Sequence, residues 1–194
     1  MTVLADRIEM AEESGELTLD VMFEWLATLP VPEGTKVEII GGNIFMSPQR
    51  RTHFEIIFRI LQQLNARYSV EHLASDVRID FPGRLNGFAC DVAAIADGSV
   101  ESRGRWRYQD VEFVAEVISK DTAANDYGPK KDTYATAGVP VYLIVDPYTG
   151  QWHLHTLPKD GTYHGSVSFG FGEDIDLTDS PVGLVLKTDG FPRD

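Results

Sequence analysis

A near-continuous apolar segment, Val139 to Val145, sets the strongest limit on what this 194-residue chain can fold into. The segment shows no polar alternation, so a strand formed there must be covered on both faces, as in a sheet between two helical layers. It follows a helical pattern that ends at Gly138, a favoured residue just after a helix. This order predicts an α/β fold with a mixed central sheet flanked by helices and with extra β-hairpins.

Further helices and strands are predicted from periodicity and turn residues. Thr18 is a favourable N-cap for a helix that Pro30 ends, and Gly41-Gly42-Asn43 predicts a hairpin turn. Thr52 to Glu55 reads as a capping box that opens a second helix. That helix has an expected buried stripe of Phe54, Ile57, Phe58, Leu61 and Leu64. Strands are expected at about 74–81, 88–95, 111–118 and 151–157, and a third helix near Pro129 with Asn125 or Asp126 as its cap.

Length and composition indicate one domain over residues 17–194, preceded by a flexible acidic tail at 1–16. No apolar run is long enough to cross a membrane, and the N-terminus lacks the pattern of a signal peptide. Cys90 is the single cysteine of the chain, which excludes an intrachain disulfide framework and a cysteine-rich zinc site. A cytoplasmic protein with no membrane partner is expected.

The formal net charge of −13 is unevenly distributed along the chain. Residues 1–45 contain nine acids and two bases, and residues 132–194 contain nine acids and three bases. The middle segment, 46–131, has twelve of each. Because phosphates are repelled by an acidic surface, a nucleic acid is expected to approach the balanced middle segment. The arginines that could contact phosphates there are Arg50, Arg51, Arg103, Arg105 and Arg107, for which a solvated surface is the alternative.

Two acidic residues lie inside apolar segments that read as strands. Asp91 follows Phe88-Ala89-Cys90, and Glu116 lies within Val111 to Ile118. A carboxylate in such a segment is costly to desolvate unless a cation or hydrogen bonds compensate it. Lys130 follows at the start of the predicted helix. Two carboxylates can hold a divalent metal ion beside a phosphodiester, and a lysine can steady the attacking water or the developing negative charge, so the ordered set points to a site. Each acid taken alone could instead be a buried ion-pair partner.

The order of these motifs resembles the Uma-two family of endonucleases, within the restriction-endonuclease-like PD-(D/E)XK superfamily. The resemblance covers about residues 17–188 and implies a restriction-endonuclease-like core. The segments that carry it are 37–44 (VEIIGGNI), His53 opening a helix, 90–92 (CDV), 114–119 (VAEVIS), 126–134 (DYGPKKDTY), 138–147 (GVPVYLIVDP) and 180–184 (SPVGL).

The resemblance also implies roles for individual residues. Asp91 and Glu116 become ligands of Mg²⁺ or Mn²⁺, with the backbone carbonyl of Val117 as a third donor. Lys130 becomes the catalytic lysine, and Glu38 an additional acid facing the site from the hairpin. The sequence departs from the usual pattern in three places, with Cys90 before the aspartate, Ile118 two residues after Glu116, and Lys120-Asp121 after Ser119. Lys120 is therefore a rival amine, and His53 a further candidate residue.

The function expected from these residues is metal-dependent hydrolysis of phosphodiester bonds in DNA. Serine hydrolase, phosphate-loop and dinucleotide-binding motifs are absent from the sequence. Two alternatives stay open. One is a catalytically weak nuclease fold that acts as a nucleic-acid or protein interaction module, and the other is a structural domain whose charged groups merely pair. DNA is the expected partner, and a homodimer is compatible with the sequence, which leaves the oligomeric state open.

Overall fold

The computed structural model describes residues 17–48 and 50–194, so the expected tail at 1–16 lies outside the described residues. The chain divides into two compact units, Met1–Glu33 and Gly34–Asp194. In the first unit, α2 (Leu19–Leu26) is capped as predicted, since the Thr18 hydroxyl accepts a hydrogen bond from the Val21 amide at 3.3 Å. The helix ends at Leu26, one turn before the first proline. No described helix has the length and apolarity needed to cross a membrane.

The second unit is built on a six-stranded sheet in the order β10-β9-β8-β7-β6-β3. β7 and β8 run parallel and the other neighbours are antiparallel, which confirms the predicted mixed sheet. Every residue of β8 is buried, as its unbroken apolar sequence requires. The strands are β3 (Leu73–Ala74), β6 (Val92–Ile95), β7 (Val111–Val117), β8 (Val141–Asp146), β9 (Gln151–Lys159) and β10 (Thr162–Gly170).

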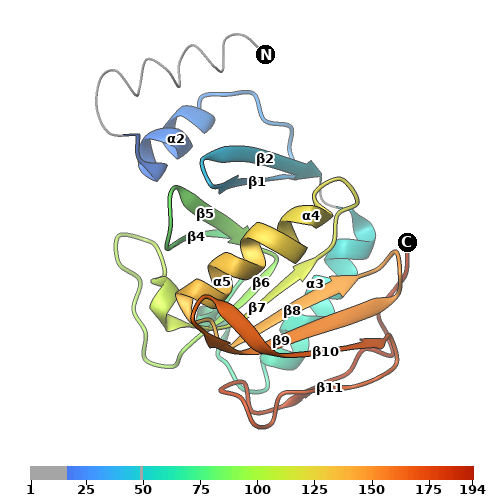
Figure 1. Cartoon of the computed structure of the whole chain (residues 1–194). Coiled ribbons are helices and arrows are strands. Elements are labelled where there is room, and N and C mark those ends of the chain that lie inside the picture. The colour runs from blue at the N-terminus through green and yellow to red at the C-terminus, as the bar shows by residue number, and fades with distance from the viewer. Residues whose placement is uncertain (1–16, 49) are drawn as a thin grey trace. The chain divides into compact units, whose positions relative to one another are not determined.

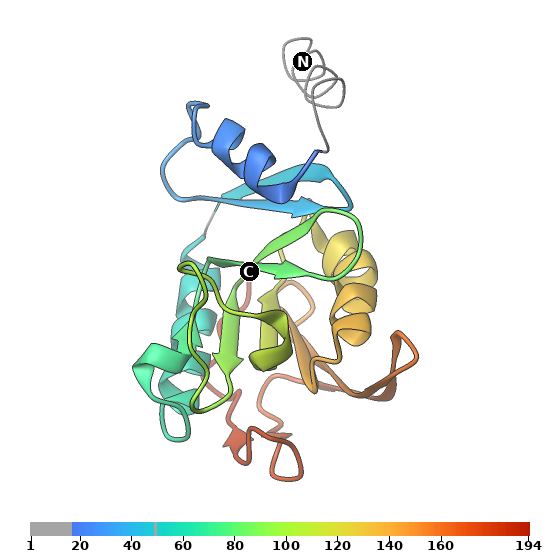
Figure 2. The ribbon, with the colours of Figure 1, turned by 90° about the vertical axis from the view of Figure 1, so that its left-hand side faces the viewer.

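Helices lie on both faces of this sheet (Figures 1 and 2). α3 (Arg51–Leu64) packs on one face with the C-terminal segment, and a second helical stretch packs on the other. That stretch consists of α4 (Ala123–Asn125), the π-helical turn η3 (Asp126–Lys130) and α5 (Lys131–Ala137). Gly138 ends it with φ of +76°, a left-handed conformation that glycine adopts without steric strain.

A second sheet has the strand order β2-β1-β5-β4. The expected hairpin is confirmed, because β1 and β2 pair across Gly41 and Gly42, whose φ values are +59° and +83°. The strands are β1 (Thr35–Ile40), β2 (Asn43–Pro48), β4 (Val77–Phe81) and β5 (Asn86–Cys90). The remaining elements are η1 (Val70–His72), η2 (Tyr108–Asp110), β11 (Ile175–Asp176) and β12 (Val185–Leu186).

The single strand expected at 88–95 is wrong in one important respect. The segment breaks at Asp91 into β5, which pairs with β4 and β1, and β6, which pairs with β7 and β3. Asp91 is thus the single residue that separates β5, in the four-stranded sheet, from β6, in the six-stranded sheet. Periodicity could not show this break, because the residues on both sides of it are equally apolar and equally buried.

The predicted face of α3 is wrong in part, since Ile57 and Leu64 are buried as expected but the two phenylalanines are not. Arg50 is the N-cap residue and makes no side-chain capping bond, so the capping box is not formed. Phe54 and Phe58 are 59% and 47% exposed, while His53 and Ile60 are buried on the inner face. The helix is therefore turned by about one residue, or 100° on a helical wheel, from the expected orientation.

The third helix begins earlier than expected. It starts at Ala123 and continues through Asp126 and Pro129, so neither Asn125 nor Asp126 is an external cap. Proline lacks an amide proton and its ring interferes with the carbonyl four residues earlier. The wider π-helical turn accommodates Pro129 inside the helix, and such turns often lie beside functional sites.

Candidate functional site

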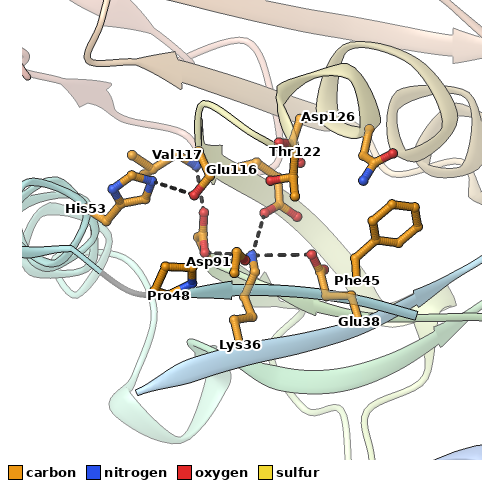
Figure 3. Close-up of a pocket in the computed structure, with 13 residues that line it drawn as sticks. Lys36, Glu38, Phe45, Pro48, His53, Asp91, Glu116, Val117, Thr122 and Asp126 are labelled. Carbon is orange, nitrogen blue, oxygen red and sulfur yellow. Dashed lines mark hydrogen bonds and ion pairs between the residues drawn. The ribbon is translucent and has the colours of Figure 1, made fainter. Parts of the chain in front are cut away.

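A pocket opens in the second unit, where β1, the β5–β6 bend and the end of β7 come together (Figure 3). The elements come from three distant parts of the sequence, and each contributes a charged side chain. The charged and polar residues that line the pocket include Lys36, Glu38, His53, Asp91, Glu116, Ser119 and Asp126.

β1 supplies two side chains to this pocket. Lys36 and Glu38 are two residues apart on one strand, so both point to the same face. The Lys36 ammonium lies 2.8 Å from Asp91 Oδ1, 3.3 Å from Glu116 Oε2 and 3.6 Å from Glu38 Oε2. Three carboxylates therefore converge on one cationic group (Figure 3).

Asp91 is held by the backbone as well as by Lys36. Its Oδ2 accepts a 2.7 Å hydrogen bond from the amide of Val117, at the end of β7. This bond joins the β5–β6 bend to the neighbouring strand and fixes the carboxylate plane. The other oxygen, Oδ1, is directed to Lys36 in the pocket.

Glu116 is held from the opposite side by the π-helical turn and α5. Its Oε1 lies 2.6 Å from the Lys130 ammonium and accepts a 2.6 Å hydrogen bond from the Tyr134 hydroxyl. Lys130 also bonds Glu38 Oε1 at 3.0 Å and Asp126 Oδ1 at 3.2 Å. With 1% of its side chain exposed, Lys130 lies behind the carboxylates and not on the described pocket surface.

The electrostatic environment keeps Glu116 ionised. Burial by itself would raise the pKa of this carboxyl, but the charges of Lys130 and Lys36 and two hydrogen bonds outweigh it and lower the pKa to about 2. Burial likewise opposes the charged form of Lys36, yet Asp91 and Glu116 raise its pKa well above the usual value. Both partners of this pair are thus charged at neutral pH.

Asp126 behaves differently from the other acids. Burial raises its pKa to about 7, and the charges of Glu116 and Glu38 add to this effect while Lys130 opposes it. The cluster as a whole holds four carboxylates against the two ammonium groups of Lys36 and Lys130. Two carboxylates are therefore in excess when all four are ionised, which favours an additional cation.

His53 lines the pocket from the first turn of α3. Its Nε2 is 3.2 Å from the Ser119 hydroxyl, and its Nδ1 is buried without a hydrogen-bond partner among the described residues. Burial lowers its pKa, against the opposing charge of Asp91, so the imidazole is neutral at pH 7. Lys120, the rival amine, is exposed in the loop after β7 and does not line the described pocket.

The arginines fall into two groups. Arg50 and Arg51 begin α3 next to the pocket residues Pro48 and His53, with Arg50 bonded to the Tyr148 hydroxyl at 3.0 Å and Arg51 to Glu55 at 2.7 Å. The stretch from Arg103 to Arg107 is anchored elsewhere. There, the Arg105 side chain donates a 3.2 Å hydrogen bond to Asp80, and the backbone of Arg107 forms a parallel β-bridge with Asp80. Asp80 in turn pairs with Gly87 on β5. Gly87 is four residues from Asp91, or roughly 13 Å along an extended strand.

The structure therefore brings Asp91, Glu116, Lys130 and Glu38 together, as the sequence predicted. Sequence reasoning missed Lys36, although its spacing of two residues from Glu38 on a strand was a usable signal. Tyr134 packs in the core against Phe81 and Phe88, and its hydroxyl also donates a hydrogen bond to Glu116.

The donor set fits a hard divalent cation. Asp91 and Glu116 each offer one carboxylate oxygen to the pocket, and Val117 borders the same space. Oxygen donors are the preferred ligands of Mg²⁺ and Mn²⁺, which commonly take one or two carboxylates and complete their coordination with water. Among residues 17–48 and 50–194, no three His, Cys, Asp or Glu side chains are placed to hold a metal ion together.

Comparisons with known proteins identify the family and the fold of this chain. The Uma2 family model, described as "Putative restriction endonuclease", matches residues 23–189. One similar solved structure is described as "a putative nuclease belonging to DUF820 from Anabaena variabilis". It is 16% identical, with a TM-score of 0.68 over 91% of this chain and 97% of the other, which supports the shared fold. A search of curated proteins found no match.

Proposed function

The chain belongs to the Uma2 family of restriction-endonuclease-like proteins, and from this premise we propose that it is a metal-dependent endonuclease acting on DNA. One observation carries the proposal. Asp91 Oδ1, from the bend between β5 and β6, and Glu116 Oε2, from β7, converge on the Lys36 ammonium inside a pocket.

Asp91 and Glu116, with the backbone carbonyl of Val117, would hold Mg²⁺ or Mn²⁺ in this pocket. When bound, the ion would lower the pKa of a coordinated water and neutralise charge that develops on the phosphate. Neighbouring groups orient each of these two carboxylate ligands. The Val117 amide orients Asp91, and Lys130 together with Tyr134 orients Glu116 and keeps it ionised.

The two lysines serve different purposes in this proposal. Lys130 is enclosed by Glu38, Glu116 and Asp126, so its amine acts through Glu116 and not on the substrate. Lys36 lines the pocket and is the amine that can face a phosphate oxygen. The role that the resemblance assigns to the catalytic lysine therefore falls to Lys36, and Lys130 positions the metal ligand.

Mn²⁺ titration and a plasmid-nicking assay test the function together. The purified chain should bind Mn²⁺ and nick supercoiled plasmid with Mg²⁺ or Mn²⁺ but not with a chelator present. Asp91→Asn should reduce Mn²⁺ affinity and cleavage by at least about 10²-fold, the upper range for loss of an interaction that supports a metal site. Its thermal midpoint without metal should stay near that of the wild type, since Asn keeps the volume and an acceptor for the Val117 amide.

Other outcomes of the same pair of measurements separate the alternatives. Mn²⁺ binding with no nicking of any tested DNA would support the catalytically weak interaction module. Unchanged Mn²⁺ affinity in Asp91→Asn, with clear destabilisation, would show instead that Asp91 serves only as the ion-pair partner of Lys36 and is not a metal ligand. Absence of Mn²⁺ binding by the wild type would refute the proposed function.

A further inference from the structure

Two oxygens remain available to a cation in the pocket, and both are bonded to Lys36. Asp91 Oδ2 is already taken by the Val117 amide, which leaves Oδ1. Glu116 Oε1 is taken by Lys130 and Tyr134, which leaves Oε2. Lys36 lies 2.8 Å and 3.3 Å from these two remaining oxygens.

We propose that Lys36 is an internal counter-cation that holds the metal position in the metal-free protein and is displaced when a divalent ion binds. This inference rests on the proposed function, because it concerns the same two carboxylates. It goes further by making metal binding an exchange of one cation for another.

The exchange follows from the charges and from the shared oxygens. An ion that takes Asp91 Oδ1 and Glu116 Oε2 must take them from Lys36, and two like charges at one small site repel each other strongly. The same arrangement would stabilise the metal-free fold. Without Lys36, three buried carboxylates would face one another with Lys130 as the nearest cation, and uncompensated buried charge is strongly destabilising.

Lys36 is suited to move and Lys130 is not. The Lys130 ammonium is bound by Glu38, Glu116 and Asp126, and its side chain is 1% exposed. The Lys36 side chain is 9% exposed, emerges from β1 and borders the open pocket. A lysine carries its charge on a flexible four-carbon stem, so its amine can turn into the pocket without movement of the strand.

Amine acylation of the wild-type protein tests the displacement directly. The protein is treated with a limiting amount of an acylating reagent, with and without saturating Mn²⁺, and modification at each lysine is measured by peptide mass spectrometry. We expect Lys36 to react at least fivefold faster with Mn²⁺ than without it. Lys130 should stay unreactive in both conditions, and the exposed Lys120 should react equally in both. Bound Mn²⁺ with no rise in Lys36 reactivity would overturn the inference.

Calorimetric titration of Lys36 variants gives a second, independent measurement. Lys36→Met removes the ammonium group that competes with the ion, so Mn²⁺ binding should tighten by about tenfold. This factor is expected if Lys36 occupies the metal position in about nine-tenths of the metal-free molecules. The matched variant Lys36→Arg keeps a cation at this position, so its Mn²⁺ affinity should not exceed that of the wild type. If Lys36→Met fails to fold, the acylation experiment still decides.

The results distinguish this inference from the proposed function. If the wild type binds Mn²⁺ and Lys36→Met binds it no more tightly, the exchange is refuted while the metal-dependent function stands. If neither protein binds Mn²⁺, the proposed function fails, and this inference fails with it.

Discussion

At the scale of single residues, the site is a network of buried charges in which each group depends on its neighbours. Glu116 is 1% exposed and has contacts with Lys36, Lys130 and Tyr134. Glu38 connects the network to the second sheet, since its Oε1 accepts a 3.0 Å hydrogen bond from the Ala89 amide as well as one from Lys130. Removal of one member therefore leaves several others without compensation.

Replacement of Lys130 should reveal its supporting role. Lys130→Met leaves Glu116, Glu38 and Asp126 without their shared cation, so the free energy of unfolding should fall by about 3–5 kcal/mol. Lys120→Met, on the exposed loop, should change it by less than about 0.5 kcal/mol. Urea denaturation at pH 7 measures both, and equal effects in the two variants would contradict the assignment of Lys130 to the buried network.

At the scale of whole elements, α3 shows how packing selects one face among several apolar ones. Its sequence offers aromatic residues at Phe54 and Phe58, yet the buried face carries His53, Ile56 and Ile60. This orientation brings His53 to the pocket, and Arg50 and Arg51 lie at the start of the same helix. The placement of the helix thus contributes to the site as well as to the core.

Core substitutions in α3 should confirm which face is buried. Ile60→Ala removes a fully buried side chain and should lower the free energy of unfolding by about 2–5 kcal/mol. Phe58→Ala, at a position that is 47% exposed, should lower it by less than about 1 kcal/mol. Guanidinium denaturation of both variants provides the comparison, and a larger effect at Phe58 would show that the helix is turned the other way.

His155 makes the stability of the β9–β10 hairpin depend on pH. Its ring lies 5.9 Å from that of Tyr142 and 5.8 Å from that of Tyr163, and burial, with the nearby charges of Lys131 and His153, lowers its pKa to about 4. In the unfolded chain its pKa is near 6.5, so the unfolded state binds more protons between pH 6.5 and pH 4. His155 therefore contributes a loss of stability as the pH falls through this range.

Replacement of His155 should weaken this acid sensitivity. His155→Gln should show a smaller decrease in the free energy of unfolding between pH 6.5 and pH 4 than the wild type. The control is His164→Gln on β10, where the side chain is exposed, so that both variants lose one histidine. Chemical denaturation at several pH values measures the three profiles, and parallel curves for His155→Gln and the wild type would contradict the prediction.

At the scale of the whole molecule, the charge distribution limits how a phosphate backbone can approach. The net charge is −13, but the acidic excess belongs to residues 1–45 and 132–194. Arg50 and Arg51 begin α3, between the pocket residues Pro48 and His53 in the sequence, whereas Arg105 and Arg107 are anchored at Asp80 on β4. DNA contacts are therefore expected to be strongest at the start of α3.

The salt dependence of DNA binding should rank the two arginine groups. The double change Arg50→Ala, Arg51→Ala should weaken binding and reduce the log–log salt slope by up to about two units, since each lost phosphate contact accounts for about one. The triple change Arg103→Ala, Arg105→Ala, Arg107→Ala should reduce the slope less, and Mn²⁺ affinity should be unchanged in both. Fluorescence anisotropy across a salt series measures the slopes, and a larger effect of the triple change would place the DNA along β4 and β5.

Local patterns in the sequence were sufficient for much of the fold. Gly41-Gly42 specified a hairpin because both positions need positive φ, and Thr18 and Gly138 marked helix ends through capping and left-handed geometry. The unbroken apolar run now seen as β8 required burial on both faces. The acids at Asp91 and Glu116 were recognisable because carboxylates are unusual in apolar strands.

Only the tertiary structure decided which partners these groups have. Lys36 joins Asp91 and Glu116 across 55 and 80 residues of sequence. Its spacing from Glu38 indicates a shared strand face, but the packing of distant elements decides which carboxylates it meets. The break at Asp91, the rotation of α3 and the enclosure of Lys130 likewise depend on how apolar surfaces pack together. Sequence periodicity determines which residues can be buried, whereas the packing of distant elements determines which charges meet, and that meeting forms the site.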